Sequence, residues 1–259
     1  MNEKIIIPLQ SRKHIKYSMA YPLISVITVC YNAAKALEKT FQSIACQDYP
    51  NIEYIVVDGG STDDTALLLK KYGCVIDKQV SEKDYGIYDA MNKGVGMATG
   101  EWCCFINAGD TFVSNDTISK VFSEKRNADV IYGDVVKYDK NGNANVKRAK
   151  SPRNSHRMYF CHQSAFTRTE CLRNTPYDIK HRMSADFKLY KQLWKQGCCF
   201  LQLDFPISVF DTSGVSNSQR SKGLADNISV IREVDSVADQ LRLLPRLYFT
   251  YWSAKLRGK

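Results

Sequence analysis

The sequence of 259 residues has no apolar run that approaches the roughly eighteen residues of a membrane-spanning helix. It has no apolar segment followed by a small-residue cleavage site near its start, so we expect no secretory signal. It also has no internal repeat and no low-complexity linker. We therefore expect a cytoplasmic chain with an N-terminal extension (1–21), one large domain (22–220) and a C-terminal helical, basic and aromatic appendage (221–259).

Several well-known functional motifs are missing. There is no G-x-x-x-x-G-K-[ST], and Gly59-Gly60 does not form G-x-G-x-x-G, which argues against a P-loop NTPase and a Rossmann dehydrogenase. None of the nine cysteines stands in a C-x-x-C arrangement, so we expect buried, reduced thiols and no zinc site. No RNP1 or zinc-finger motif accompanies the net charge of +9, and we expect no nucleic-acid partner.

Acidic residues are absent from two basic stretches, 144–159 and 241–259. We interpret the first as a solvated loop. The second mixes aromatic residues, leucines and positive charges, which is typical of an interfacial amphipathic segment. Pro245 could begin a new helix there. We expect contact with the inner face of a membrane through 241–259, and the alternative is a helix packed on the domain with solvated charges.

Apolar residues make up 44% of the chain, enough for a sizeable core. Short apolar runs predict strands, and between them the apolar residues recur with helical spacing. The predicted strands are 23–29, 52–57, 74–80 and 102–106, and the predicted helices are 37–44, 67–71 and 87–98. This alternation predicts an α/β fold with a parallel sheet and right-handed crossovers.

The pattern loosens after residue 110, where we expect a smaller mixed region. The predicted helices there are 117–126, 185–196 and 223–244. The predicted strands are 130–132, 163–167, 198–203 and 207–210. Asn141-Gly142 lies between strand-like runs and signals a hairpin.

Polar residues follow three of the predicted strands. Tyr31 and Asn32 end the first, Asp58 ends the second and Asp110 follows the fourth. Because ligands gather at the carboxyl ends of parallel strands, we expect these side chains at one edge. A nucleotide base could lie there, with Asp58 accepting a hydrogen bond from a ring N–H or a ribose hydroxyl.

Three blocks of the sequence, 26–32, 47–63 and 98–102, resemble family 2 glycosyltransferases of the GT-A fold, in the order and with the spacing of that family. The resemblance is strong over 22–112 and traceable to about 215. It implies a Rossmann-like, mostly parallel sheet with helices on both faces. It also implies an enzyme that takes a sugar from a nucleoside diphosphate and usually inverts the anomeric carbon.

The resemblance also implies roles for individual residues. Thr28, Tyr31, Asn32 and Asp58 match positions that hold the nucleotide, and Asp84 lies in a segment that lines the same pocket. The family's DxD motif reads Asn107-Ala108-Gly109-Asp110 here, so Gly109 stands where a second carboxylate is expected. We expect Asp110 to bind Mg²⁺ or Mn²⁺, with Asn107 supporting the metal or a sugar hydroxyl.

The family's general base is often the second acid of a Glu-Asp pair before a helix. The chain has Ala185-Asp186 there, and we expect Asp186 to be the base. His162-Gln163 resembles a polar pair on the acceptor side, and Asp134, at the end of a predicted strand, is a weaker candidate. Residues 211–216 resemble a "G-G-[VI]-S" loop whose first glycine is Ser213.

The sequence thus favours an inverting transferase that moves a sugar from a nucleotide donor, with a UDP-sugar expected, to a glycan or polyprenyl-linked acceptor in cell-surface polysaccharide biosynthesis. One alternative is a catalytically inactive sugar-nucleotide binder. A sugar nucleotidyltransferase is disfavoured, because Cys30-Tyr31-Asn32-Ala33 replaces the Gly-rich, Arg-containing loop of that class.

Overall fold

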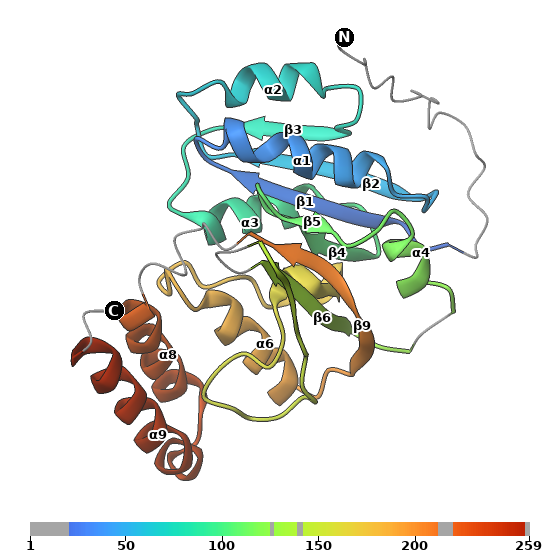
Figure 1. Ribbon diagram of the computed structural model, residues 1–259. Coiled ribbons are helices and arrows are strands. Elements are labelled where there is room, and N and C mark those ends of the chain that lie inside the picture. Colours follow the sequence, from blue (N-terminus) through green and yellow to red (C-terminus); the bar gives the residue numbers. More distant parts are fainter. Residues whose placement is uncertain (1–20, 125–126, 139–141, 212–219, 257–259) are drawn as a thin grey trace.

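The computed structural model describes residues 21–124, 127–138, 142–211 and 220–256. These residues form a nine-stranded sheet with helices on both faces (Figure 1). The strands, in order across the sheet, are β3 (Lys78–Ser81), β2 (Ile52–Asp58), β1 (Ile24–Cys30), β4 (Trp102–Phe105), β8 (Ala165–Arg168), β6 (Val130–Tyr138), β9 (Phe200–Phe210) and β5 (Thr111–Phe112), with β7 (Ala144–Lys147) paired to β6.

The half of the sheet formed by β3, β2, β1 and β4 is parallel, as the sequence predicts. Every residue of β1, β2 and β4 is buried, because helices cover both faces and leave no solvated side. β3 begins four residues later than predicted. Asp77 precedes it, and its carboxylate accepts the Tyr54 amide of β2 at 2.7 Å, which fixes the start of the pairing.

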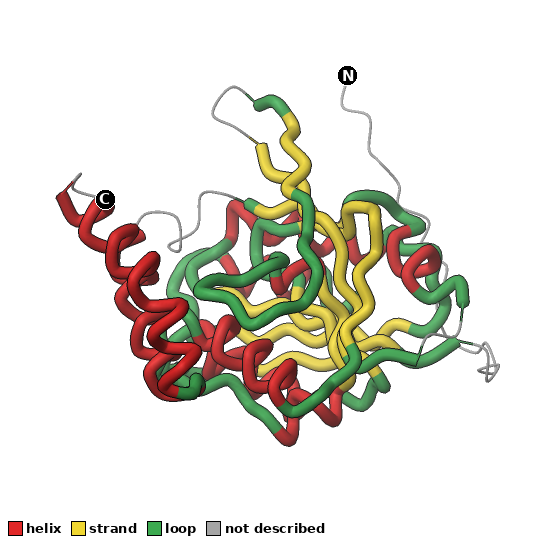
Figure 2. Tube along the Cα trace, turned by 90° about the horizontal axis from the view of Figure 1, so that it is seen from below, coloured by secondary structure: helices red, strands yellow, loops and turns green. Residues whose placement is uncertain are grey.

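The other half is mixed, because β8 is antiparallel to both β4 and β6. Two predictions are wrong here. β6 does not end at Tyr132 but continues to Tyr138, so Asp134 lies inside a strand. The two strands expected at 198–203 and 207–210 are one strand, β9, which absorbs Pro206 through register shifts opposite Tyr132–Val135. The predicted hairpin is formed by β6 and β7, which project together from the sheet (Figure 2).

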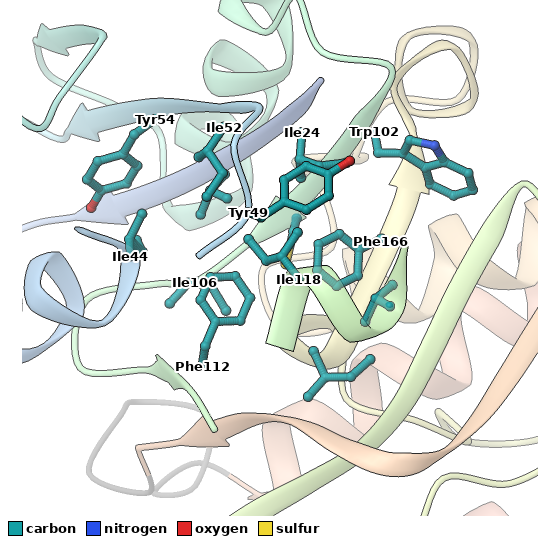
Figure 3. Packing of buried hydrophobic residues seen from close by; sticks show 14 of the residues in the cluster. Ile24, Ile44, Tyr49, Ile52, Tyr54, Trp102, Ile106, Phe112, Ile118 and Phe166 are labelled. Atoms are coloured by element: carbon teal, nitrogen blue, oxygen red, sulfur yellow. The ribbon is translucent and has the colours of Figure 1, made fainter. Parts of the chain in front are cut away.

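Two hydrophobic clusters cover the two faces. On one face, α1 (Ala34–Ala45), α2 (Thr65–Lys71) and α4 (Thr117–Val121) pack on the sheet. Leu37, Phe41 and Ile44 of α1 are fully buried, which confirms the predicted apolar face, and Figure 3 shows Ile44 within this cluster. The opposite face carries α3 (Ile87–Met97), α5 (Thr169–Asn174) and α6 (Ala185–Lys195).

Two C-terminal helices, α8 (Arg220–Val234) and α9 (Val237–Leu256), lie side by side and pack on α6 through Phe187 (Figures 1 and 2). The sequence predicted one helix over 223–244. The chain breaks instead at Ser236, whose hydroxyl accepts the Asp239 amide at 3.3 Å and so caps α9. Pro245 lies inside α9 and does not begin a helix. None of the described helices is long and apolar enough to cross a membrane.

All nine cysteines are free thiols. Their predicted burial holds for Cys30, Cys103 and Cys104 but is wrong for three others, which are exposed. Cys46, Cys74 and Cys199 follow the ends of helices or precede a strand, where an apolar neighbourhood in the sequence does not mean burial.

Candidate active site

The first strand end carries two predicted nucleotide residues in contrasting surroundings. Thr28 is fully buried, and its hydroxyl donates to the Ile106 carbonyl at 2.7 Å and accepts the Tyr54 hydroxyl at 2.9 Å. It therefore fastens β1 to the end of β4. Tyr31 exposes 62% of its surface, so its ring is open to a stacking partner.

Asp58 joins the loops that follow β2 and β3. Its carboxylate is 1% exposed and accepts the Ser61 amide at 3.1 Å and the Ser81 hydroxyl at 2.6 Å. The loop after β1 is tied to the same turn, because Asn32, in a left-handed conformation (φ 48°), accepts the Thr62 amide at 2.8 Å. The structure thus brings Asn32 and Asp58 to one edge of the sheet.

Asp84 reaches this edge because Gly59 has no side chain. A Cβ atom added to Gly59 would lie 2.3 Å from the Asp84 carboxylate. The other carboxylate oxygen of Asp84 accepts the Gly86 amide at 2.9 Å, just before α3 begins. All three acidic or amide residues predicted around the nucleotide are therefore neighbours in space.

The turn after β4 forms a second corner. Asp110 is 3% exposed, and one of its carboxylate oxygens accepts the Asp211 amide at 2.8 Å. Burial raises the pKa of Asp110 to about 6, although the Asp211 amide stabilises its charged form. Thr40 of α1 fixes the turn through two hydrogen bonds. Its hydroxyl donates to the Asp110 carbonyl at 2.8 Å and accepts the Gly109 amide at 3.0 Å.

Asp186 lies in the first turn of α6, as the sequence predicts, and three groups hold it. The Tyr88 hydroxyl donates to Oδ1 at 3.0 Å, the Phe187 amide donates to the same oxygen at 2.8 Å, and His162 Nδ1 lies 3.1 Å from Oδ2. Burial raises the pKa of Asp186, but the hydrogen bond and charge of His162 outweigh it and the pKa lies below its usual value. Asp186 is therefore an ionised carboxylate at neutral pH.

The predicted pair His162-Gln163 lies in the short helix η1 (His162–Ser164) and links these two corners. His162 contacts Asp186, and it also lowers the pKa of Asp110. The side chain of Gln163 lowers the pKa of Asp110 as well. The candidate base and the carboxylate after β4 thus share one polar neighbourhood.

Asp134 has a different role from the one considered for it. It is 1% exposed, and its carboxylate accepts the Ala149 amide at 2.8 Å and Arg148 at 3.1 Å. It anchors the basic stretch to β6. The segment 212–216 of the predicted loop lies outside the described residues.

Sequence reasoning missed Tyr88, Thr40 and Asp211. Tyr88 falls on the apolar face of α3 and gives no local signal of its hydroxyl's role. Thr40 is one of many threonines. Asp211 was noted only as part of a loop, although it follows a predicted strand, as Asp58 and Asp110 do.

A divalent cation fits the corner at Asp110. Carboxylate and amide oxygens are ligands that Mg²⁺ and Mn²⁺ prefer, and among the described residues the buried Asn107 Oδ1 has no hydrogen-bond partner. A second cluster of possible metal ligands joins the segment before α6 to α8 and consists of Asp178, His181 and Glu233. There Lys188 Nζ lies 2.6 Å from Asp178 and 2.5 Å from Glu233, so an ammonium already balances these charges.

Comparisons with known proteins agree with this geometry. The description "Glycosyl transferase family 2" matches residues 25–194. A "PGL/p-HBAD biosynthesis glycosyltransferase" of Mycobacterium bovis (strain BCG / Pasteur 1173P2) is 34% identical over 180 residues, which cover 65% of this chain and 68% of that protein. "Glycosyltransferase GlyG" of Streptococcus pneumoniae serotype 4 is 34% identical over 123 residues, which cover 45% of this chain and 40% of that protein.

Two solved structures share the fold. The mannosyltransferase PcManGT from Pyrobaculum calidifontis, in complex with GDP-Man and Mn²⁺, has a TM-score of 0.65 at 18% identity and covers 82% of this chain and 64% of its own. S. aureus TarS 1-349 in complex with UDP has a TM-score of 0.61 at 19% identity and covers 83% of this chain and 67% of its own. The chain belongs to glycosyl transferase family 2, has the GT-A fold, and is a glycosyltransferase.

Proposed function

We propose that this glycosyltransferase is inverting, uses a nucleoside-diphosphate sugar, with UDP as the nucleotide, and transfers the sugar to a hydroxyl of a glycan or a polyprenyl-linked sugar in cell-surface polysaccharide biosynthesis. The observation that carries the proposal is the placement of Asp186. Its carboxylate is held by Tyr88, the Phe187 amide and His162, it lies at the start of a helix, and its partner His162 also lowers the pKa of Asp110.

Asp186 is the general base of the proposed reaction. Its carboxylate takes the proton of the acceptor hydroxyl as that oxygen attacks the anomeric carbon. The bond from the anomeric carbon to the diphosphate oxygen breaks, and its electron pair leaves with the nucleoside diphosphate. Attack from the face opposite the leaving group inverts the anomeric carbon. Tyr88 and the Phe187 amide orient the carboxylate and keep it charged.

The nucleotide lies along the edge formed by Tyr31, Asn32, Asp58 and Asp84 in this proposal. The exposed ring of Tyr31 offers a stacking surface for the base, and the carboxylates offer acceptors for ring N–H and ribose hydroxyl groups. Asp110, with Asn107 beside it, would hold Mg²⁺ or Mn²⁺, which neutralises the charge of the diphosphate. TarS with UDP and PcManGT with GDP-Man and Mn²⁺ support this class of donor and metal.

The proposal assigns transfer to residues 22–220 and contact with the cytoplasmic face of a membrane to the appendage 221–259. One face of α9 packs on α8 through Leu243 and Leu247. The opposite face is exposed and apolar. It carries Leu241, Pro245, Phe249, Trp252 and Leu256 at helical spacing, with Arg242, Arg246 and Lys255 nearby and no acid after Asp239 in the helix.

This second face fits an anionic bilayer surface. Aromatic and leucine side chains enter the headgroup region while the flanking cations pair with lipid phosphates. A polyprenyl-linked acceptor sits at such a surface, so the contact would bring the enzyme to its substrate.

A donor screen tests the proposed transfer. The purified protein is incubated with UDP- and GDP-sugars and Mn²⁺, with and without lipid-linked or glycan acceptors, and the released nucleoside diphosphate is measured. We expect release from a UDP-sugar and, by NMR of the product, an inverted anomeric configuration. A protein that binds UDP but shows neither transfer nor slow hydrolysis of the donor would favour an inactive sugar-nucleotide binder. Retention of configuration would exclude the base mechanism.

A further inference from the structure

The turn after β4 lacks a carboxylate at position 109, and the structure brings another one to that place. Gly109 has φ +97°, and a Cβ atom added to it would lie 2.7 Å from Asp211 Oδ2. The carboxylate of Asp211, from the end of β9, therefore lies where a side chain of residue 109 would begin. Asp211 could not keep its present position if residue 109 had a side chain.

Asp211 is fixed beside Asp110 through the backbone. Its amide donates to Asp110 Oδ1 at 2.8 Å, and the negative charge of Asp211 raises the pKa of Asp110, although burial is the larger cause. The two negative charges repel each other, and a cation beside them reduces this repulsion.

A cation does accompany this pair. Lys39 of α1 places its ammonium 2.9 Å from Asp211 Oδ2, and about half of its side chain is exposed to solvent. Because Lys39 comes from a helix surface and its side chain is flexible, it can leave Asp211 at small cost. Asn107 begins the same turn as Asp110, and its buried Oδ1 lacks a hydrogen-bond partner among the described residues.

We propose that Asp211 is the second carboxylate of the divalent-cation site at Asp110, and that Lys39 occupies Asp211 until the metal displaces it. The proposal rests on the proposed function, because it concerns the metal that accompanies the donor. It explains how the chain keeps two acidic ligands with Gly109 in the motif. A divalent ion bound by two carboxylates and an amide oxygen is more strongly held than one bound by Asp110 alone.

Binding of Mn²⁺ alone tests this assignment without any turnover. The electron paramagnetic resonance signal of free Mn²⁺ is titrated with the nucleotide-free protein and its variants. We expect Asp211→Asn to weaken binding about tenfold or more. We expect Lys39→Met to strengthen binding several-fold, because it removes the competing cation. Asp204→Asn, which removes an exposed carboxylate from the same strand, is the matched control and should bind as the wild type does.

Two results would overturn the inference. In the first, Asp211→Asn binds Mn²⁺ as tightly as the wild type while Asp110→Asn does not. In the second, Lys39→Met leaves the affinity for Mn²⁺ unchanged or lowers it. The Lys39 variant keeps the test valid even if the Asp211 variant does not fold. Failure of the proposed function looks different, because the metal titrations would follow these expectations while no sugar nucleotide is turned over. If the wild type transfers sugar, Asp186→Asn does not, and the wild type binds no Mn²⁺, the metal inference is wrong while the proposed function stands.

Discussion

At the scale of single residues, Tyr88 contributes to the charge state of the candidate base, after His162 and the Phe187 amide. Its hydroxyl donates to Asp186 Oδ1 at 3.0 Å and so stabilises the carboxylate form. Tyr88→Phe removes this donor, which raises the pKa of Asp186. A general base works only when ionised, so the acid limb of the pH profile of kcat/KM should move to higher pH, while kcat at neutral pH, where the carboxylate remains ionised, should stay close to that of the wild type.

Tyr177 offers a matched control for that change. Its ring stacks on Tyr88 with centroids 5.5 Å apart, but its hydroxyl is not among the donors to Asp186. Tyr177→Phe should therefore leave the acid limb where it is. Equal shifts in both variants would mean that packing, and not the hydrogen bond, sets the pH profile.

The residues that could be predicted from the sequence are those that end or begin a periodic element. Asp58 and Asp110 follow apolar strands, and Asp186 begins an amphipathic helix, so local pattern placed them at the ends of these elements, and the family resemblance assigned their expected roles. Tyr88 and Asp211 could not be found in this way. Their roles depend on chain segments about one hundred residues apart coming together, which no local pattern encodes.

At the scale of elements, a charged cluster joins the C-terminal helix α8 to α6 and to the segment before α6. The His181 ring bridges two carboxylates of α8, with Nδ1 2.7 Å from Asp226 and Nε2 3.1 Å from Glu233. Lys188 of α6 contacts Glu233 and also Asp178. Burial lowers the pKa of His181, but the hydrogen bonds and charges of Asp226 and Glu233 outweigh it, and the pKa lies above 6.5.

This cluster predicts a pH dependence of stability. Because the pKa of His181 is higher in the folded than in the unfolded chain, its stabilising effect is complete below pH 6.5 and is lost as pH rises through the folded pKa. The melting temperature of the wild type, relative to that of His181→Gln, should therefore fall by a few degrees as the pH rises from 6.5 to about 8. Parallel melting curves for the two proteins across this range would contradict the account.

Elements were predictable where the sequence shows a continuous apolar run or an apolar helical face, and less so where tertiary contacts set their limits. The parallel strands and α1, α3 and α6 follow their apolar patterns. The continuity of β9 does not, because Pro206 usually ends a strand and only the shifted register opposite it permits pairing. The break at Ser236 had a signal that was missed, since Ser236 followed three residues later by Asp239 resembles a capping box.

At the scale of the whole molecule, the exposed face of α9 predicts binding to anionic vesicles. The protein should sediment with vesicles that contain phosphatidylglycerol, more weakly with phosphatidylcholine alone, and less at high salt. Replacing Phe249 and Trp252 by Ser removes two exposed rings and should reduce binding about tenfold. Leu67→Ser, at an exposed leucine of α2, is the control and should bind normally. Unchanged sedimentation of the double variant would exclude α9 as the contact.

The residues of the candidate active site come from four separate parts of the chain. Asp110 follows β4, Tyr88 lies on α3, His162 on η1 and Asp186 on α6. The parallel strands supply the edge at which we propose that the nucleotide binds, and the mixed half of the sheet is followed by helix α6, which carries the proposed base. The sequence resemblance is strongest over the parallel half, which carries the proposed donor residues.

The role of Asp186 is the central claim, and its removal tests that claim most directly. Sugar transfer from the donor found in the screen is measured for the wild type, for Asp186→Asn and for Glu170→Gln, which removes a similar charge from the first turn of α5. We predict that kcat falls about 10²- to 10⁴-fold in Asp186→Asn, with nucleotide binding and melting temperature retained, and that Glu170→Gln transfers normally. Full transfer by a folded Asp186→Asn protein would contradict the account.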